Sequence, residues 1–293
     1  MTSAADRVPA PLLVLAGIVS VQFGGALAAT LVPVIGAGGS VVLRLLFASA
    51  LLLVFVRPRW RGHSRRARLT VIAFGVALGL MNFTFYSSLA HLPIGVAVTI
   101  EFIGPLTLAA ALSRRWVDAV AVAAAAAGVV LISEALHTPF AELEKTGIAL
   151  ALLAGAFWAA YIVLAGRTGS EFPKLEGLAL AMVVATIVTL PFGITSAHTW
   201  SPDIILKAFG IAVLSSVLPY SLELLALRRL SAKVFGILLS LEPAFAALAG
   251  LIVLGQVLTP TQLMGMALVV AASALVLGLG AHQKPDPAEA AST

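Results

Sequence analysis

The chain has 293 residues, of which 60% are hydrophobic and only 11% are charged. A water-soluble domain of this size needs more charge to cover its surface, so the composition indicates a chain embedded in a membrane. The sequence contains no cysteine, which excludes disulfides, thiol chemistry and cysteine-ligated metals.

Ten apolar runs follow one another along the chain, each long enough to cross a bilayer. About 20 residues of helix span the ~30 Å of hydrocarbon. The predicted spans are 11–32, 38–56, 69–90, 94–113, 117–134, 147–166, 175–196, 204–226, 233–254 and 260–281. No stretch alternates apolar and polar residues over about ten positions, which argues against a transmembrane barrel. We therefore expect an all-α integral membrane protein with ten transmembrane helices.

The first span also has features of a signal peptide. Arg7 precedes an apolar stretch that contains the tripeptide Ala-Leu-Ala at 26–28. The apolar run continues to Val32, however, and is long enough to cross the membrane. We expect this segment to be retained as the first transmembrane helix.

The basic residues fix an expected orientation. Of the 18 Lys and Arg residues, fifteen lie in even-numbered connections or on the two tails, two lie in odd-numbered connections, and Arg44 lies inside a span. Cytoplasmic loops carry such an excess of positive charge, so both termini are expected in the cytoplasm. The same bias accounts for the run RPRWRGHSRRAR, and no nucleic-acid partner is expected.

The second half of the chain repeats the first. A shift of 138 residues places Pro105 on Pro243 and aligns 86–105 with 224–243 without a gap. Each half has an odd number of spans, so the second half enters the membrane upside down, as in many transporters. The expected organisation is a 5+5 inverted-repeat bundle. It comprises a cytoplasmic tail (1–10), a first repeat (11–134), an extracytoplasmic connection (135–146), a second repeat (147–281) and a cytoplasmic tail (282–293).

Ionisable side chains inside the spans are candidate functional groups, because burying them in hydrocarbon is costly. At ~1.5 Å of rise per residue, Arg44 and Glu101 enter from the same side and reach a similar depth, where they could pair. Buried ion pairs are often architectural, so the alternatives for this pair are a structural bridge and a substrate role.

Glu242 and Glu223 are two further acidic candidates. Glu242 lies near the midplane, about 14 Å from the end of its span, without a basic residue at its depth. Its neighbour Pro243 disturbs the helix and frees carbonyl groups, and a structural hydrogen bond is the alternative for Glu242. Glu223 lies five residues from Arg228, so the sequence alone favours a surface pair with Arg228 or Arg229.

Polar and aromatic side chains share helix faces with these groups. Asn82 and Tyr86 are spaced i,i+4, and Tyr220 and Glu223 are spaced i,i+3, so each pair lies on one face. Trp158 and Tyr161 do the same on the sixth span. Aromatic residues in spans are usually packing groups or interfacial anchors, and the spacing alone does not assign them a function.

Several segments carry a resemblance to a known family. They are LRLLFAS (43–49), GLMNFTFYSSLAHLPIGVAVTIEFIGPL (79–106), GAFWAAYIV (155–163), LSSVLPYSLELLALRRL (214–230) and FGILLSLEPAFAALAGLIVLGQVLTPTQLMG (235–265). The chain resembles the drug/metabolite transporter superfamily with two EamA-type repeats, and within it the bacterial threonine and homoserine exporters. The resemblance covers residues 11–281 and raises the weight of Glu223, which lies in the marked segment PYSLE. One departure is Gln256, where the superfamily pattern usually has glutamate.

The resemblance implies a bacterial inner-membrane exporter of small amino acids. A zwitterionic amino acid needs an acceptor for its ammonium group and a donor for its carboxylate, and three glutamates and one arginine supply both. Because burial favours the neutral form of a carboxyl group, one glutamate is expected to carry a proton, which supports proton antiport. The expected partners are a small amino acid, protons and the lipid bilayer, while the oligomeric state stays open.

Other functions have less support in the sequence. The alternative within the same fold is export of another solute, such as a nucleobase or an organic cation, because fold does not settle cargo. The sequence lacks H-E-x-x-H, G-x-S-x-G and G-x-x-x-x-G-K-[ST], which argues against an intramembrane enzyme and against direct ATP drive. An ion channel would need a ring of equivalent groups, which the pseudo-symmetry does not place. No enzymatic activity, cofactor or metal is expected.

Overall fold

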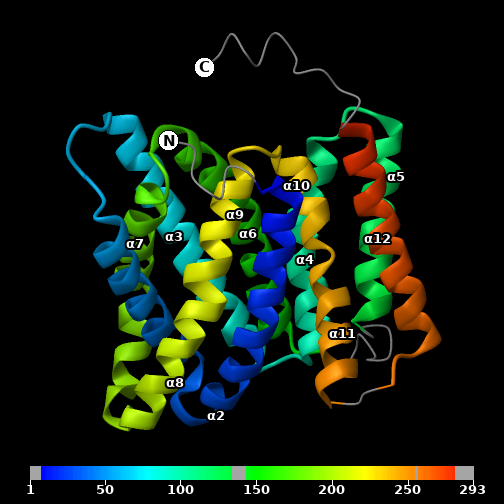
Figure 1. Cartoon of the computed structure of the whole chain (residues 1–293). Helices are drawn as coiled ribbons and strands as arrows, with labels where there is room; N and C mark the ends of the chain where they lie inside the picture. The colour runs from blue at the N-terminus through cyan, green and yellow to red at the C-terminus, as the bar shows by residue number, and fades with distance from the viewer. Residues whose placement is uncertain (1–7, 134–142, 255–256, 281–293) are drawn as a thin grey trace.

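The computed structural model describes residues 8–133, 143–254 and 257–280, and the regular structure within these ranges is helical throughout (Figure 1). Seven of the described helical segments are long and apolar enough to cross a membrane by themselves. The helices are α2 (Ala10–Val56), α3 (Arg65–Ser88), α4 (Ile94–Ala111), α5 (Trp116–Ile132), α6 (Lys145–Glu171), α7 (Glu176–Gly193), η3 (Ile194–Thr199), α8 (Pro202–Ala212), η4 (Val213–Val217), α9 (Leu218–Leu227), α10 (Ala232–Leu239), α11 (Glu242–Leu254) and α12 (Pro260–Gly280).

Helix α2 contains the first two predicted spans. Its regular geometry is interrupted at Gly36, whose φ of 72° and ψ of 170° are not helical, and Pro33 lies just before this point. A positive φ is easily adopted only by glycine, so the chain reverses here without further loop residues. Figure 1 shows the two arms of α2 running in opposite directions through the bundle.

Two of the predicted spans are irregular. The span at 204–226 consists of α8 and α9 joined by the π-helical turn η4, which contains Ser215 and Ser216. The span at 233–254 is broken into α10 and α11 at Ser240 and Leu241, directly before Glu242. Irregular backbone at membrane depth is tolerated where it is buried in protein or lines a cavity, so both interruptions mark places of interest.

The helices pack into a single bundle around α3, α6 and α2. Helix α3 packs against α6 and α7, α4 packs against α6, and α12 packs against α5. Helix α3 approaches α7 closely at Gly75 and Gly79, since a methyl group on either residue would meet the backbone of α7. Large apolar side chains such as Phe55 (79% exposed) and Leu206 (72%) face outward, as expected of a surface covered by lipid.

The connections fall at the two ends of the bundle. Residues 57–64, 112–115, 172–175 and 228–231 lie at the end where α2 begins and α12 finishes, the upper end in Figure 1. We call this end the basic face, because most loop Lys and Arg residues lie there. The connections 89–93 and 194–201 lie at the opposite face.

The fold class predicted from the sequence is confirmed: the chain is an all-α membrane protein with ten transmembrane helices in a 5+5 arrangement. The domain boundaries of the two repeats stay a prediction. Most of the predicted connection at 135–146 and the predicted tails at 1–10 and 282–293 lie outside the described residues, as does the family departure Gln256.

Candidate functional site

Arg44 is buried in the bundle, with 5% of its surface exposed. It lies on the second arm of α2, and its guanidinium group donates hydrogen bonds to Asn82 Oδ1 and, over 3.1 Å, to the Tyr86 hydroxyl. The Tyr86 ring also lies 5.0 Å from Arg44 Cζ, in position for a cation–π contact. The Nε–H of Arg44 is buried and has no partner among the described residues. The arginine is thus held in place, and its Nε–H is left for a ligand.

Asn82 and Tyr220 meet at the centre of the bundle. The Asn82 amide Nδ2 donates to the Tyr220 hydroxyl over 2.9 Å, and that hydroxyl lies 3.2 Å from Asn82 Oδ1. The two residues are 138 positions apart, which is the repeat offset found in the sequence. Equivalent residues of two inverted repeats can touch only at the pseudo-twofold axis, so this contact locates the axis. It places Arg44, through Asn82, beside the interface between the repeats.

Glu223 lies one helical turn beyond Tyr220 and is 6% exposed. Its Oε2 accepts a hydrogen bond of 2.6 Å from the Tyr161 hydroxyl of α6. The rings of Tyr161 and Tyr220 lie 5.7 Å apart, so the two tyrosines connect Glu223 to the Asn82 contact. Tyr161 is also packed against Phe74 at 5.4 Å and is fully buried. This part of the site is therefore rigid.

Glu101 and Glu242 lie beside this network. Glu101 on α4 is 8% exposed, and Glu242 begins α11 immediately after the helix break. The carboxylates of Glu101 and Glu242 are close enough to act on one another electrostatically, as are those of Glu242 and Glu223. Among the described residues, nothing hydrogen-bonds the carboxylate of Glu101 or of Glu242. Two acceptors without protein donors are available to bind a cationic group or a proton.

Trp158 of α6 packs against α4 next to Glu101. Its ring packs edge-on against Phe102, with centroids 4.8 Å apart, and Phe102 follows Glu101 directly. A methyl group on Gly155, one turn before Trp158, would approach within 2.5 Å of the Glu101 carbonyl oxygen. Close packing of α4 on α6 therefore fixes the backbone that carries Glu101.

The structure gathers all nine residues singled out in the sequence, but it changes two predicted pairings. Arg44 contacts Asn82 and Tyr86 and forms no ion pair with Glu101. Residue depth gives only the position along the membrane normal and does not say which way a helix turns its face. Glu223 does not reach a surface arginine, so that interpretation is wrong; Arg228 instead donates to the Lys174 carbonyl over 3.2 Å.

Two buried serines on η4, Ser215 and Ser216, were not predicted from the sequence as candidate site residues. Ser216 is fully buried and precedes Tyr220 by four residues, so it lies near the same face, and neither its hydroxyl nor that of Ser215 has a partner among the described residues. A π-helical turn has no recognisable sequence signal, since Ser215 and Ser216 fit an ordinary helix. The equivalence of Asn82 and Tyr220 can be read from the sequence, because the two residues are separated by the repeat offset.

Comparison with known proteins places this arrangement in a family. The model of the EamA-like transporter family matches residues 145–278, a range that overlaps the predicted second repeat. The threonine/homoserine exporter RhtA of Escherichia coli (strain K12) is 40% identical over 264 residues, covering 89% of this chain and 88% of the relative. The exporter of the same name from Salmonella typhimurium (strain LT2) is 40% identical over 265 residues, covering 89% of each chain.

The chain belongs to the EamA-like transporters of the drug/metabolite transporter superfamily. It is accordingly a multi-pass membrane transporter and not an enzyme. An uncharacterized transporter of Haemophilus influenzae is 31% identical over 124 residues, which cover 40% of this chain and 72% of that protein. A solved structure titled "Crystal structure of protein" has a TM-score of 0.69 at 16% identity and covers 93% of this chain and 99% of its own. This last likeness concerns the fold alone.

Proposed function

We propose that this EamA-like transporter exports small neutral amino acids of the threonine and homoserine type, in exchange for protons. The observation that carries the proposal is the 40% identity, over 89% of the chain, to exporters named for threonine and homoserine. An identity of this level across both repeats includes the helices that build the site. The cargo is therefore expected to be similar.

The chemistry of the site supports a zwitterionic cargo. Arg44 offers a buried donor without a partner, which suits a carboxylate, and the carboxylates of Glu101 and Glu242 suit an ammonium group. The free serine hydroxyls on η4 suit a cargo that carries a hydroxyl group of its own. The same helix bundle thus offers hydrogen-bonding groups for the carboxylate, the ammonium group and the hydroxyl group of threonine.

The charges of the site support proton coupling. Three carboxylates and one guanidinium would leave a net charge of minus two inside the membrane if all were ionised, and burying such charge is costly. Bound ammonium or bound protons offset this cost. In our proposal Glu242 exchanges its proton for the cargo, while Glu101 and Arg44 orient it. The basic face is the cytoplasmic side, in keeping with the positive-inside rule.

The experiment that tests the proposal is transport by purified protein in proteoliposomes with an imposed pH gradient. Labelled threonine and homoserine are expected to move against their gradients, and N-acetylthreonine and threonine methyl ester, which each lack one charge, are expected to compete at least ~10-fold less well. An organic cation and a nucleobase serve as the contrasting cargo. If these move and threonine does not, the cargo proposal is wrong although the family assignment stands.

A further inference from the structure

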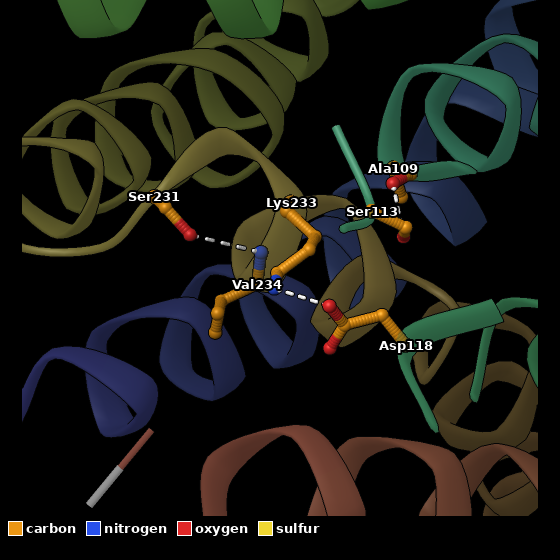
Figure 2. A network of polar contacts seen from close by, with 6 residues as sticks. All are labelled: Ala109, Ser113, Asp118, Ser231, Lys233 and Val234. Carbon is orange, nitrogen blue, oxygen red and sulfur yellow. Dashed lines mark hydrogen bonds and ion pairs between the residues drawn. The ribbon is translucent and has the colours of Figure 1, made fainter. Parts of the chain in front are cut away.

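An ion pair joins the two repeats at the basic face. Lys233 Nζ lies 2.9 Å from Asp118 Oδ2, and the Asp118 side chain is only 4% exposed while that of Lys233 is 23% exposed. Figure 2 shows the two side chains pointing toward each other, Asp118 from α5 of the first repeat and Lys233 from α10 of the second. A pair at this degree of burial is screened less by water than an exposed one, and either charge left alone would be costly.

The position of Lys233 is unfavourable for a cation without a partner. Helix α10 starts after Ser231, whose Oγ accepts a hydrogen bond from Val234 N over 3.4 Å, so Lys233 lies in the first turn. The N-terminal turn of a helix repels positive charge and attracts negative charge. Asp118 occupies the favourable position in the first turn of α5. Lys233 therefore depends on Asp118, and the ion pair joins α10 to α5 at this face.

The equivalent positions at the opposite face carry no charge. The repeat offset places Lys233 on Gly95. Asp118 is matched instead by its place in its helix: it is the third residue of α5, and the third residue of α12 is Gln262. Gln262 uses its Oε1 to accept a hydrogen bond of 3.0 Å from Thr259 N, within its own helix end. Inverted repeats close the two faces with equivalent elements. Among the residues that the structure describes, an ion pair joins those elements at the basic face and not at the opposite one.

Helix α10 connects this ion pair to the candidate site. It is eight residues long, with Lys233 in its first turn and the break at Ser240 and Leu241 at its other end. At the break Ser240 N donates to Ile237 O and Leu241 N to Leu238 O, each over 3.1 Å, as in a tight 3₁₀ turn. Glu242 follows directly. Short breaks of this kind act as hinges, so α10 can tilt as one rigid piece.

We propose that the Asp118–Lys233 pair is a latch that holds the basic face closed, and that α10 opens it when the occupant of Glu242 changes. The inference rests on the proposed transport function, because it describes how the same site gains access to the cytoplasm. The latch stabilises the state closed at the basic face. The pair described at the opposite face, His91–Glu144, is more exposed than the latch and is therefore weaker, so the resting equilibrium lies toward the state closed at the basic face.

The experiment uses a cysteine as a reporter, since the natural chain has none. Ser240→Cys places a thiol at the break, where Ser240 is fully buried. Labelling by a membrane-impermeant maleimide is measured in vesicles that expose the basic face. Asp118→Asn and Lys233→Met are each expected to raise the labelling rate about tenfold, while Lys233→Arg keeps the charge and leaves the rate near that of the parent.

A matched control comes from the opposite face, where His91 Nδ1 lies 2.8 Å from Glu144 Oε2 in a more exposed pair. Glu144→Gln is expected to leave labelling from the basic face unchanged. Parental labelling rates in both Asp118→Asn and Lys233→Met would overturn the latch, as would an equal rise in Lys233→Arg. Labelling needs no cargo, so a failure of threonine transport in the parent protein would overturn the proposed function separately.

Discussion

Helix α4 of the first repeat and the pair α10–α11 of the second are equivalent elements that differ in shape. The offset places Pro105 on Pro243, yet α4 continues through its proline whereas the second element breaks just before it. The residues that precede the prolines differ. Gly104 packs directly on the backbone of α6 at Gly155, while the equivalent position in the second repeat is Glu242.

A proline therefore permits a break in a helix, and the packing of the neighbouring residues decides whether the helix breaks. Proline removes one backbone N–H and one helical hydrogen bond wherever it stands inside a helix. At Gly104 the tight contact with α6 keeps α4 straight. A glutamate cannot pack in that way, so the break before Glu242 leaves its carboxylate without a hydrogen bond from the described residues. The first repeat thus provides Glu101 on a continuous helix, and the second repeat provides Glu242 at a hinge.

We expect the largest difference in transport between the two sites when Glu242 and Glu101 are each replaced by glutamine. Glu242→Gln is expected to abolish pH-driven efflux and to keep at least part of the exchange of labelled for unlabelled threonine, because an amide does not titrate and so cannot release a proton, but leaves the cargo route intact. Glu101→Gln is expected to lower both modes by a similar factor, since it weakens cargo binding itself. Both variants are assayed in proteoliposomes with and without a pH gradient. Undiminished pH-driven transport by Glu242→Gln would remove the distinction.

A smaller effect is expected when the prolines are replaced. Pro243→Ala restores the N–H that can bond to Leu239 O and favours a continuous helix, so we expect pH-driven transport to fall about tenfold with unchanged or slightly raised stability. Pro105→Ala acts on a helix that is already continuous and is expected to change transport less than about twofold. Transport rates and thermal unfolding of the two variants are compared directly. Equal losses of transport would show that the hinge is not specific to the second repeat.

The smallest effect is expected at the rigid part of the site. Tyr161→Phe removes the hydrogen bond to Glu223 and leaves that buried carboxylate with one donor fewer, at a cost of about 1–3 kcal/mol in stability. Because the ring keeps its packing against Phe74, the fold is preserved. We expect a lower midpoint of thermal unfolding and a loss of transport of no more than about fivefold. A loss as complete as that of Glu242→Gln would instead give Glu223 the coupling role.

Much of this comparison was predictable from the sequence. Apolar runs predict the spans because a helix that crosses hydrocarbon must be apolar, and the shift of 138 residues aligns the two prolines in the sequence itself. The buried charged residues were found for the same reason, since so few polar groups occur in the spans. The unusual position of Pro243 beside Glu242 also indicated a disturbed helix.

The pairing of side chains was not predictable, because it depends on how each helix is rotated about its axis. Arg44 and Glu101 have matching depths, yet Arg44 turns toward Asn82 and Tyr86. Glu223 was assigned to the surface because Arg228 is near in sequence, but the tyrosine that binds it comes from α6, 62 positions earlier. The latch partners Asp118 and Lys233 are 115 positions apart and show no pattern in the sequence.

Proton release on cargo binding tests the central claim most directly, namely that Glu242 holds either a proton or the cargo. Threonine is added to purified protein in a weakly buffered solution, and bound threonine and the change in pH are measured together. We predict release of about one proton for each threonine bound by the parent protein, and none by Glu242→Gln at concentrations where it still binds threonine. Threonine binding without proton release by the parent protein, or full release by Glu242→Gln, would contradict the account.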